Sequence, residues 1–201
     1  MNDKVVISGI PFYTQRLDAE NYIAEGFPTV SEAEHWSERV CGLACIKMVI
    51  AGFTGKTIPL YELLQEGLKM NAYKEDLGWV HQGLVDIAKH HGLRGGRESI
   101  KDDLRKIYAH LKKGEIVIPS VSPGLEGGKV YHLKSGKDYV VPRGGHLVVV
   151  YGATVKDHKV ASLTLHHPSS EKEYEWESHT LTADEFMKSF SKNGNIMFIS
   201  K

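Results

Sequence analysis

The sequence has few cysteines and no excess of charge of either sign. Its 201 residues contain two cysteines, Cys41 and Cys45, which are too few and too close together for a disulfide framework. The 25 basic and 25 acidic side chains cancel, so bulk electrostatics do not attract the chain to nucleic acid or to an anionic membrane. The composition therefore argues against a disulfide-rich scaffold and against a nucleic-acid-binding protein.

Long apolar runs are also missing. No stretch approaches the roughly 18 consecutive apolar residues that mark a membrane-spanning helix. The segment from Met1 to Gly9 lacks the basic start, the apolar core and the small-residue cleavage site of a signal peptide. Together with the absence of a disulfide framework, these observations lead us to expect a cytoplasmic protein that does not contact membranes.

The eleven histidines are numerous, but their spacing does not predict a metal site. No H-E-x-x-H motif occurs, His90 and His91 would point to different faces of a helix, and two cysteines are too few for structural zinc. The glycines from Gly124 to Gly128 lack the lysine and the following helix of a phosphate-binding loop. We therefore expect neither a metal nor a cofactor.

Length and apolar content predict one domain covering residues 1–201, with a core of its own. In the first part of the chain, after an extended start, apolar residues recur with helical spacing. We expect four helices there: Val40 to Gly52, Pro59 to Met70, Val80 to Gly92, and one that begins at Ser99 and stops before Gly114. The pair Gly95 and Gly96 is interpreted as a turn.

After Gly114 the spacing changes to that of strands. We expect strands at 116–118, 147–151, 160–165 and 195–200, and a further one at Tyr174 and Trp176. Thr182 to Glu185 forms a capping box for a short helix, and Pro123 to Pro142 is either a mobile flap or a long hairpin. The fold class is thus α+β, with a helical part at about 16–114 packed on an antiparallel sheet at about 115–201.

The most reactive candidate side chain is Cys41. It lies where a polar loop gives way to the apolar helix, and the amide groups at a helix N-terminus favour a thiolate. Gly42, directly after it, adds no side chain that would block a substrate carbonyl. Cys45, one turn further, is expected in the core.

A general base is predicted at His146, which follows two glycines and opens the apolar run Leu147 to Val150. The order Cys41 then His146, 105 positions apart, fits thiol hydrolases in which a helix carries the nucleophile and a sheet carries the base. The amide of Gln15 could donate to an oxyanion, although a glutamine alone indicates little.

Taken in order, IPFYTQ, CGLACIKMVIAGF and GGHLVVVYGA resemble the papain-like cysteine peptidases that process bacteriocins after a double-glycine leader, and more closely their stand-alone relatives. The similarity runs from about Ile10 to Phe190. It implies a papain-like fold with Cys41 as nucleophile, His146 as base and Gln15 as oxyanion donor. It also implies a peptide or small amide as substrate.

The sequence departs from this family at two places. Gln15 and Cys41 are 26 positions apart, so an insertion near Asn21 to Trp36 must fold over or beside the cleft. The family's aspartate or asparagine before a proline is His167 here, which can hold a tautomer but cannot supply negative charge. His167 is the first candidate for orienting His146, with Asp138 and Asp157 as carboxylates nearby in sequence.

Three functions remain open on these observations. The first is a cysteine peptidase or amidase. The second is an acyltransferase on the same fold, which passes the acyl group from Cys41 to an amine instead of water. The third is a non-catalytic binding or regulatory module, which the histidine at position 167 would favour. No oligomeric state follows from the sequence.

Overall fold

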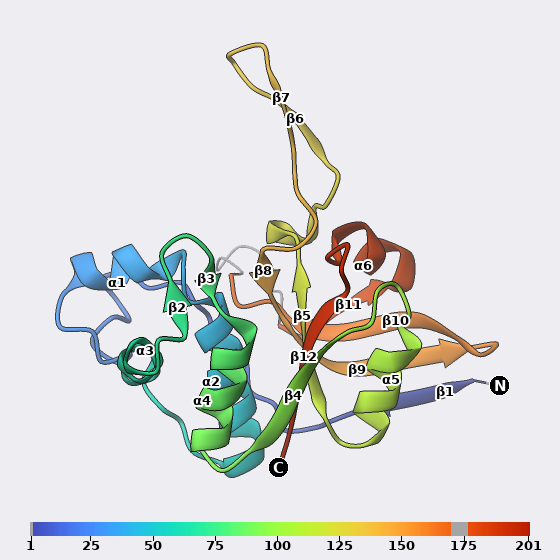
Figure 1. Cartoon of the computed structure of the whole chain (residues 1–201), viewed down its shortest axis with the longest axis horizontal. Helices are drawn as coiled ribbons and strands as arrows, with labels where there is room; N and C mark the ends of the chain where they lie inside the picture. Colours follow the sequence, from blue (N-terminus) through green and yellow to red (C-terminus); the bar gives the residue numbers. More distant parts are fainter. Residues whose placement is uncertain (1, 170–176) are drawn as a thin grey trace.

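Helix α2 (Cys41–Thr54) packs against other N-terminal helices and against the sheet in the computed structural model, which describes residues 2–169 and 177–201 (Figure 1). Every residue from Gly42 to Ala51 is buried, because the apolar side chains surround the helix and leave no polar face. The helix ends at Gly55, whose φ of 73° is the left-handed conformation that closes helices. Around it pack α1 (Val30–Ser37), α3 (Leu60–Lys69) and α4 (His81–His90).

Among the described residues the main sheet has eight strands, paired antiparallel throughout, in the order β11-β10-β9-β5-β12-β4 with β1 beside β9 and β8 beside β5. The strands are β1 (Asp3–Val6), β4 (Arg94–Ser99), β5 (Ile116–Val121), β8 (His146–Leu147), β9 (Val149–Lys156), β10 (Lys159–His166), β11 (His179–Thr182) and β12 (Asn195–Ser200). Two of these, β1 and β4, come from the N-terminal half of the chain. The order brings the start of β8 next to the end of β5.

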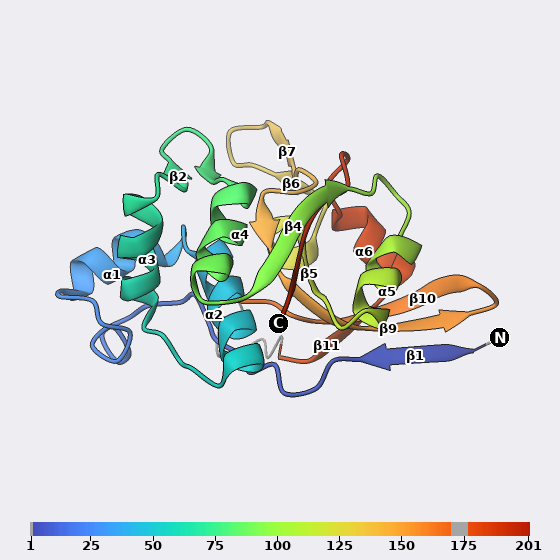
Figure 2. The same cartoon turned by 60° about the horizontal axis from the view of Figure 1, so that its bottom comes forward.

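Helices cover both faces of the sheet. On β5, Ile116 and Ile118 join the core around α2, whereas Val117 and Val121 join a second core with α5 (Arg105–Lys112) and α6 (Ala183–Ser189). Successive strand side chains point to opposite faces, so both sets are buried at once. Figure 2 shows α1 to α4 gathered at one end of the molecule and α5 with α6 at the other.

The segment between Pro123 and Pro142 contains a long hairpin, as one of the two alternatives expected, while the mobility of a flap stays a prediction. After a short 3-10 turn (Pro123–Leu125), strands β6 (Val130–His132) and β7 (Asp138–Val140) pair with each other and project from the body (Figure 1). Every residue of both strands is exposed. A second small hairpin is formed by β2 (Tyr73–Lys74) and β3 (Gly78–Trp79).

The prediction for the segment around Ser99 is wrong. Ser99 ends strand β4 and does not cap a helix, and α5 begins only at Arg105. Gly95 and Gly96 lie inside β4 and pair with β12, so they form no turn. The expected strand at Tyr174 and Trp176 lies outside the described residues. The expected insertion contains helix α1.

Within residues 2–169 and 177–201, no helix combines the length and the apolar character needed to cross a bilayer.

One charged side chain is buried inside the apolar helix α2. Lys47 is 3% exposed, and its Nζ lies 2.6 and 2.5 Å from the two carboxylate oxygens of Glu25. The same carboxylate accepts the backbone N–H of Leu60 at 2.8 Å, at the start of α3. The Lys47 ammonium also lies 4.5 Å from the ring centroid of Tyr13. The pair therefore ties α2 to the preceding loop and to α3.

Replacing Glu25 by glutamine should lower the free energy of unfolding by about 3 kcal/mol, because it leaves the Lys47 ammonium buried without a counter-charge. Urea unfolding followed by far-UV circular dichroism measures this change. The matched control is Asp86→Asn, since Asp86 pairs with Lys89 at an exposed site and should change stability by less than about 1 kcal/mol. Equal effects of the two substitutions would contradict the role of the buried pair.

Candidate active site

Cys41 is the first residue of α2, and its sulfur meets strand β8. The backbone N–H groups of Leu147, Gly42 and Cys41 itself act on the sulfur and lower the pKa of the thiol. Burial has the larger effect, and the pKa of Cys41 is raised above its usual value. This differs from the expectation of a thiolate at a helix N-terminus, because here desolvation outweighs the helix amides.

Gly42 serves helix packing. A Cβ atom at this position would lie 2.7 Å from Cδ1 of Leu84 and 3.2 Å from Cδ1 of Leu147. A side chain here would require the ends of Leu84 and Leu147 to shift, so glycine suits the close approach of α2 to α4 and β8. The expectation that Gly42 also leaves a substrate carbonyl unobstructed stays a prediction.

His146 begins β8 after a turn that requires glycine. Gly144 and Gly145 have φ values of 86° and 96°, which side chains rarely adopt. His146 then pairs with Val121, and Leu147 pairs with Ser120, so both residues are held by β5. The imidazole is 6% exposed. Because Leu147 packs against Gly42 and lines the same pocket as Cys41, the strand that carries His146 lies against the start of α2.

His167 meets His146 face to face. The ring centroids are 4.6 Å apart and the planes are inclined by 30°. A third side chain links the two rings, since Oγ of Ser169 lies 3.4 Å from Nε2 of His146 and 3.2 Å from Nδ1 of His167. Ser169 was not identified from the sequence, and its only signal is its position just after Pro168.

Both imidazoles are neutral at neutral pH. Burial, with smaller contributions from the neighbouring His167 and Arg16, lowers the pKa of His146 to about 3. Burial also lowers the pKa of His167 to about 4. With the pKa of Cys41 raised, the resting site holds a thiol and neutral imidazoles.

Gln15 connects the segments that lead to Cys41 and His167. Its Nε2 donates to the carbonyl of Ser37 at 2.8 Å, and its backbone N–H donates to the carbonyl of Pro168 at 2.7 Å. The side chain is buried, and within the described part of the chain its Oε1 has no hydrogen-bond partner. Buried oxygens without a hydrogen-bond partner are rare in folded proteins, and they can indicate a functional site. The second Nε2 hydrogen remains available.

The two carboxylates near in sequence do not orient His146. Asp138 pairs with His132 at 2.7 Å on the exposed hairpin β6–β7. Asp157 follows β9, at the opposite end of that strand from His146. The neighbouring His166 is structural, since its Nε2 lies 3.0 Å from the carbonyl of Ile10 and its Nδ1 accepts the N–H of Ser178.

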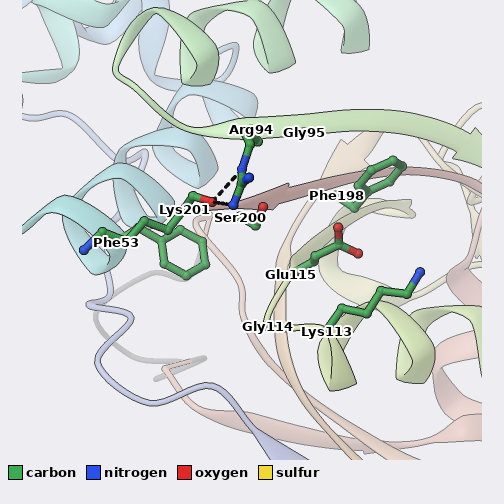
Figure 3. Close-up of a pocket in the computed structure, with 9 residues that line it drawn as sticks. All are labelled: Phe53, Arg94, Gly95, Lys113, Gly114, Glu115, Phe198, Ser200 and Lys201. Atoms are coloured by element: carbon green, nitrogen blue, oxygen red, sulfur yellow. Dashed lines mark hydrogen bonds between the residues drawn. The ribbon is translucent and has the colours of Figure 1, made fainter.

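Two hollows in the surface differ in the residues that line them, and only one of them includes Cys41. One, of about 270 Å³, opens beside Cys41 and is bordered by Gly145 and Leu147. The other, of about 490 Å³, is drawn in Figure 3 and includes Phe53, twelve residues along α2 and therefore about 18 Å from Cys41. There Arg94 is already bonded to the carbonyl oxygen of Lys201. The candidate site is therefore the hollow at Cys41.

No cluster of three metal-binding side chains occurs in the part of the chain that the structure describes. Neither a protein-family model nor a curated protein matches the sequence. Among solved structures, one described as a C39-like peptidase from Bacillus anthracis matches with a TM-score of 0.60, over 99% of this chain and 98% of that one, at 15% identity. The chain has a C39-like peptidase fold. The papain-like α+β fold expected from the sequence is thereby confirmed.

Two further structures match less closely. A double-glycine-motif protease from an AMS/PCAT transporter, in complex with the leader peptide, has a TM-score of 0.45 at 18% identity, over 80% of this chain and 84% of that one. The peptidase domain of Streptococcus ComA, a bi-functional ABC transporter involved in quorum sensing, has a TM-score of 0.48 at 17% identity, over 81% and 92%. Neither adds to the assignment of the C39-like fold.

The charge state of this candidate site predicts a pH dependence. Iodoacetamide should alkylate Cys41 slowly at pH 6 to 7, and the rate should rise about tenfold per pH unit toward alkaline pH as the thiolate fraction grows. Peptide mass spectrometry resolves Cys41 from Cys45, which is fully buried and should remain unlabelled. The His146→Ala variant should give the same slope, because a neutral ring contributes no charge. Fast labelling that is independent of pH from pH 6 upward would contradict the neutral site.

Proposed function

We propose that the protein is a thiol-dependent hydrolase, a peptidase or amidase, that uses Cys41 as nucleophile and His146 as base. The observation that carries this proposal is the pocket beside Cys41, because Gly145 and Leu147, the two residues that flank His146, line it as well. The pocket thus lies between the start of a buried helix and the strand that begins with a buried, neutral histidine. A nucleophile and a proton acceptor on two rigid elements, beside an open pocket, suit covalent catalysis.

The hydroxyl of Ser169 supports the choice of His146 as base. A serine hydroxyl can donate its hydrogen to Nδ1 of His167 and accept the Nε2–H of His146. In that tautomer Nδ1 of His146 is bare and can receive a proton. We assign to Ser169, with the stacked His167, the positioning role that an aspartate or asparagine has in the family.

The reaction follows from these roles. As the sulfur of Cys41 bonds to the carbonyl carbon, its proton passes to Nδ1 of His146. The second Nε2 hydrogen of Gln15 and the N–H of Cys41 hold the oxyanion. The C–N bond then breaks, and His146 gives the proton to the leaving amine. Water, deprotonated by His146, attacks the thioester and releases the acid and the Cys41 thiol.

The acyltransferase and the non-catalytic module remain as alternatives. The acyltransferase shares the first half of this scheme. An amine that outcompetes water at the thioester would make the protein an acyltransferase. The neutral resting site, with a raised pKa at Cys41 and a lowered pKa at His146, is the observation that favours a non-catalytic module. The hydrolase and the acyltransferase both need a reduced Cys41 thiol, so we propose that the protein acts in a reducing compartment such as the cytoplasm.

A mixed peptide library, with cleavage products read by mass spectrometry, tests the proposed hydrolysis. Cys41→Ala should abolish cleavage, and His146→Ala should lower it by about 10²- to 10⁴-fold. Gln15→Ala should lower kcat by about 10²- to 10³-fold, as expected for an oxyanion donor. The matched controls are Cys45→Ala and His132→Ala, which remove the same residue types away from the site.

Added amines separate the alternatives in the same assay. Amide products formed at the expense of acids would identify an acyltransferase. Cleavage that persists in Cys41→Ala, or its absence in the wild type although Cys41 alkylates normally, would refute the proposed hydrolase.

Ser169→Ala should lower kcat about tenfold with little change in KM, since a positioning hydrogen bond contributes about 1 kcal/mol. Ser169→Thr keeps the hydroxyl and should restore most of the rate. Ser135→Ala, at the exposed tip of the β6–β7 hairpin, is the control for loss of a serine. If alanine and threonine at 169 behave alike, the hydroxyl does not position His146.

A further inference from the structure

The pocket beside Cys41 has a wall that the proposed reaction does not use. One side is formed by Cys41, Gly145 and Leu147, and the opposite side by the β2–β3 hairpin. From that hairpin come Tyr73, Leu77, Gly78 and Trp79, and the remaining lining residues are Glu38, Arg39, His81 and Ser120. Its volume of about 270 Å³ lies below the range of about 300–1,000 Å³ that whole small ligands occupy. The pocket therefore has the size for one side chain.

The aromatic side chains of this wall are held in place by ring contacts and by a hydrogen bond. The ring of Tyr73 lies between those of Trp36 and Trp79, with centroid distances of 5.2 Å on each side and inclined planes. Trp79 donates its Nε1–H to the carbonyl of Arg39 at 2.8 Å, two residues before Cys41. Inclined aromatic contacts of this kind are favourable and restrict the rings. The wall is thus formed before any substrate arrives.

The charged groups that border the pocket already have partners. Glu38 pairs with Arg16, and the guanidinium of Arg39 donates to the carbonyl of His35 at 2.5 Å. Burial, together with Arg97, lowers the pKa of His81, so its ring is neutral at neutral pH. Glu38 therefore has its counter-charge, whereas Arg39 keeps a positive charge at the edge of the pocket, because a carbonyl is neutral. The rest of the wall, from Tyr73, Leu77 and Trp79, is mainly apolar.

Leu77 completes the wall from the tip of the hairpin. Its side chain is 75% exposed, so a large apolar group lies in water directly at the edge of the pocket. A ligand side chain that enters the pocket would cover it and remove both apolar surfaces from water.

We propose that this pocket receives a large apolar side chain of the substrate, aromatic or branched aliphatic, within two residues of the bond that Cys41 attacks. This inference rests on the proposed hydrolase. The substrate class is therefore a peptide or amide with Phe, Tyr, Trp, Leu or Ile near the cleaved bond.

The peptide-library digest provides the test when its cleavage sites are aligned. At one position within two residues of the cut, large apolar residues should be enriched at least tenfold over Glu and Lys. In Leu77→Asp that enrichment should fall about tenfold, and Lys or Arg should increase at the same position because the new carboxylate faces it. Leu133→Asp, an equally drastic change on the exposed β6–β7 hairpin, should keep the wild-type preference.

The outcomes separate this inference from the function on which it rests. Cleavage by the wild type with no apolar preference at any position near the cut would overturn the inference and leave the hydrolase intact. The same preference in Leu77→Asp as in the wild type would also overturn it. No cleavage at all would overturn both. Iodoacetamide labelling of Cys41 at a common pH should be equal in the two aspartate variants, which shows that the nucleophile itself is undisturbed.

Discussion

The burial of α2 on all sides is the constraint on which the rest of the structure depends. A helix without a polar face must be covered by α3 and α4 on one side and by the sheet on the other. Its one buried charge, on Lys47, is balanced by Glu25, so the loop before α1 is tied to the helix as well. At its first turn Gly42 lies so close to Leu84 and Leu147 that a methyl group would force their side chains to shift. The place of Cys41 relative to β8 is therefore set by packing.

The same burial determines the charge of the candidate site. Desolvation is the largest influence on Cys41, His146 and His167, and in each case it favours the neutral form. Neither of the two carboxylates expected from the sequence compensates it, since Asp138 and Asp157 lie elsewhere in the described part of the chain, and Arg16 acts in the opposite direction. A neutral thiol beside a neutral imidazole can still react if the proton moves as the sulfur attacks. Such a site relies on the positions of its hydrogen bonds more than on a standing ion pair.

How much could be predicted from the sequence depended on whether the signal was local. The apolar period of α2, the run after His146 and the capping box at Thr182 are local patterns, and the structure has each of them. Strand β4 has the sequence RGGRES, with no apolar alternation, and it is a strand because β12 pairs with it from a distant part of the chain. Ser169 was missed for a similar reason. Its hydroxyl acquires a role only when folding brings His146 and His167 together.

The long interval between Gln15 and Cys41, a departure from the family pattern, has a physical use in this fold. The added residues form α1, and Trp36 at its end supports the ring of Tyr73. The following residue, Ser37, accepts the amide of Gln15 through its carbonyl, while its hydroxyl accepts the N–H of Leu17. One short helix thus contributes both to the proposed oxyanion donor and to the wall of the pocket. A substitution that loosened α1 would therefore disturb binding and catalysis together, although no residue of α1 need touch the reacting atoms.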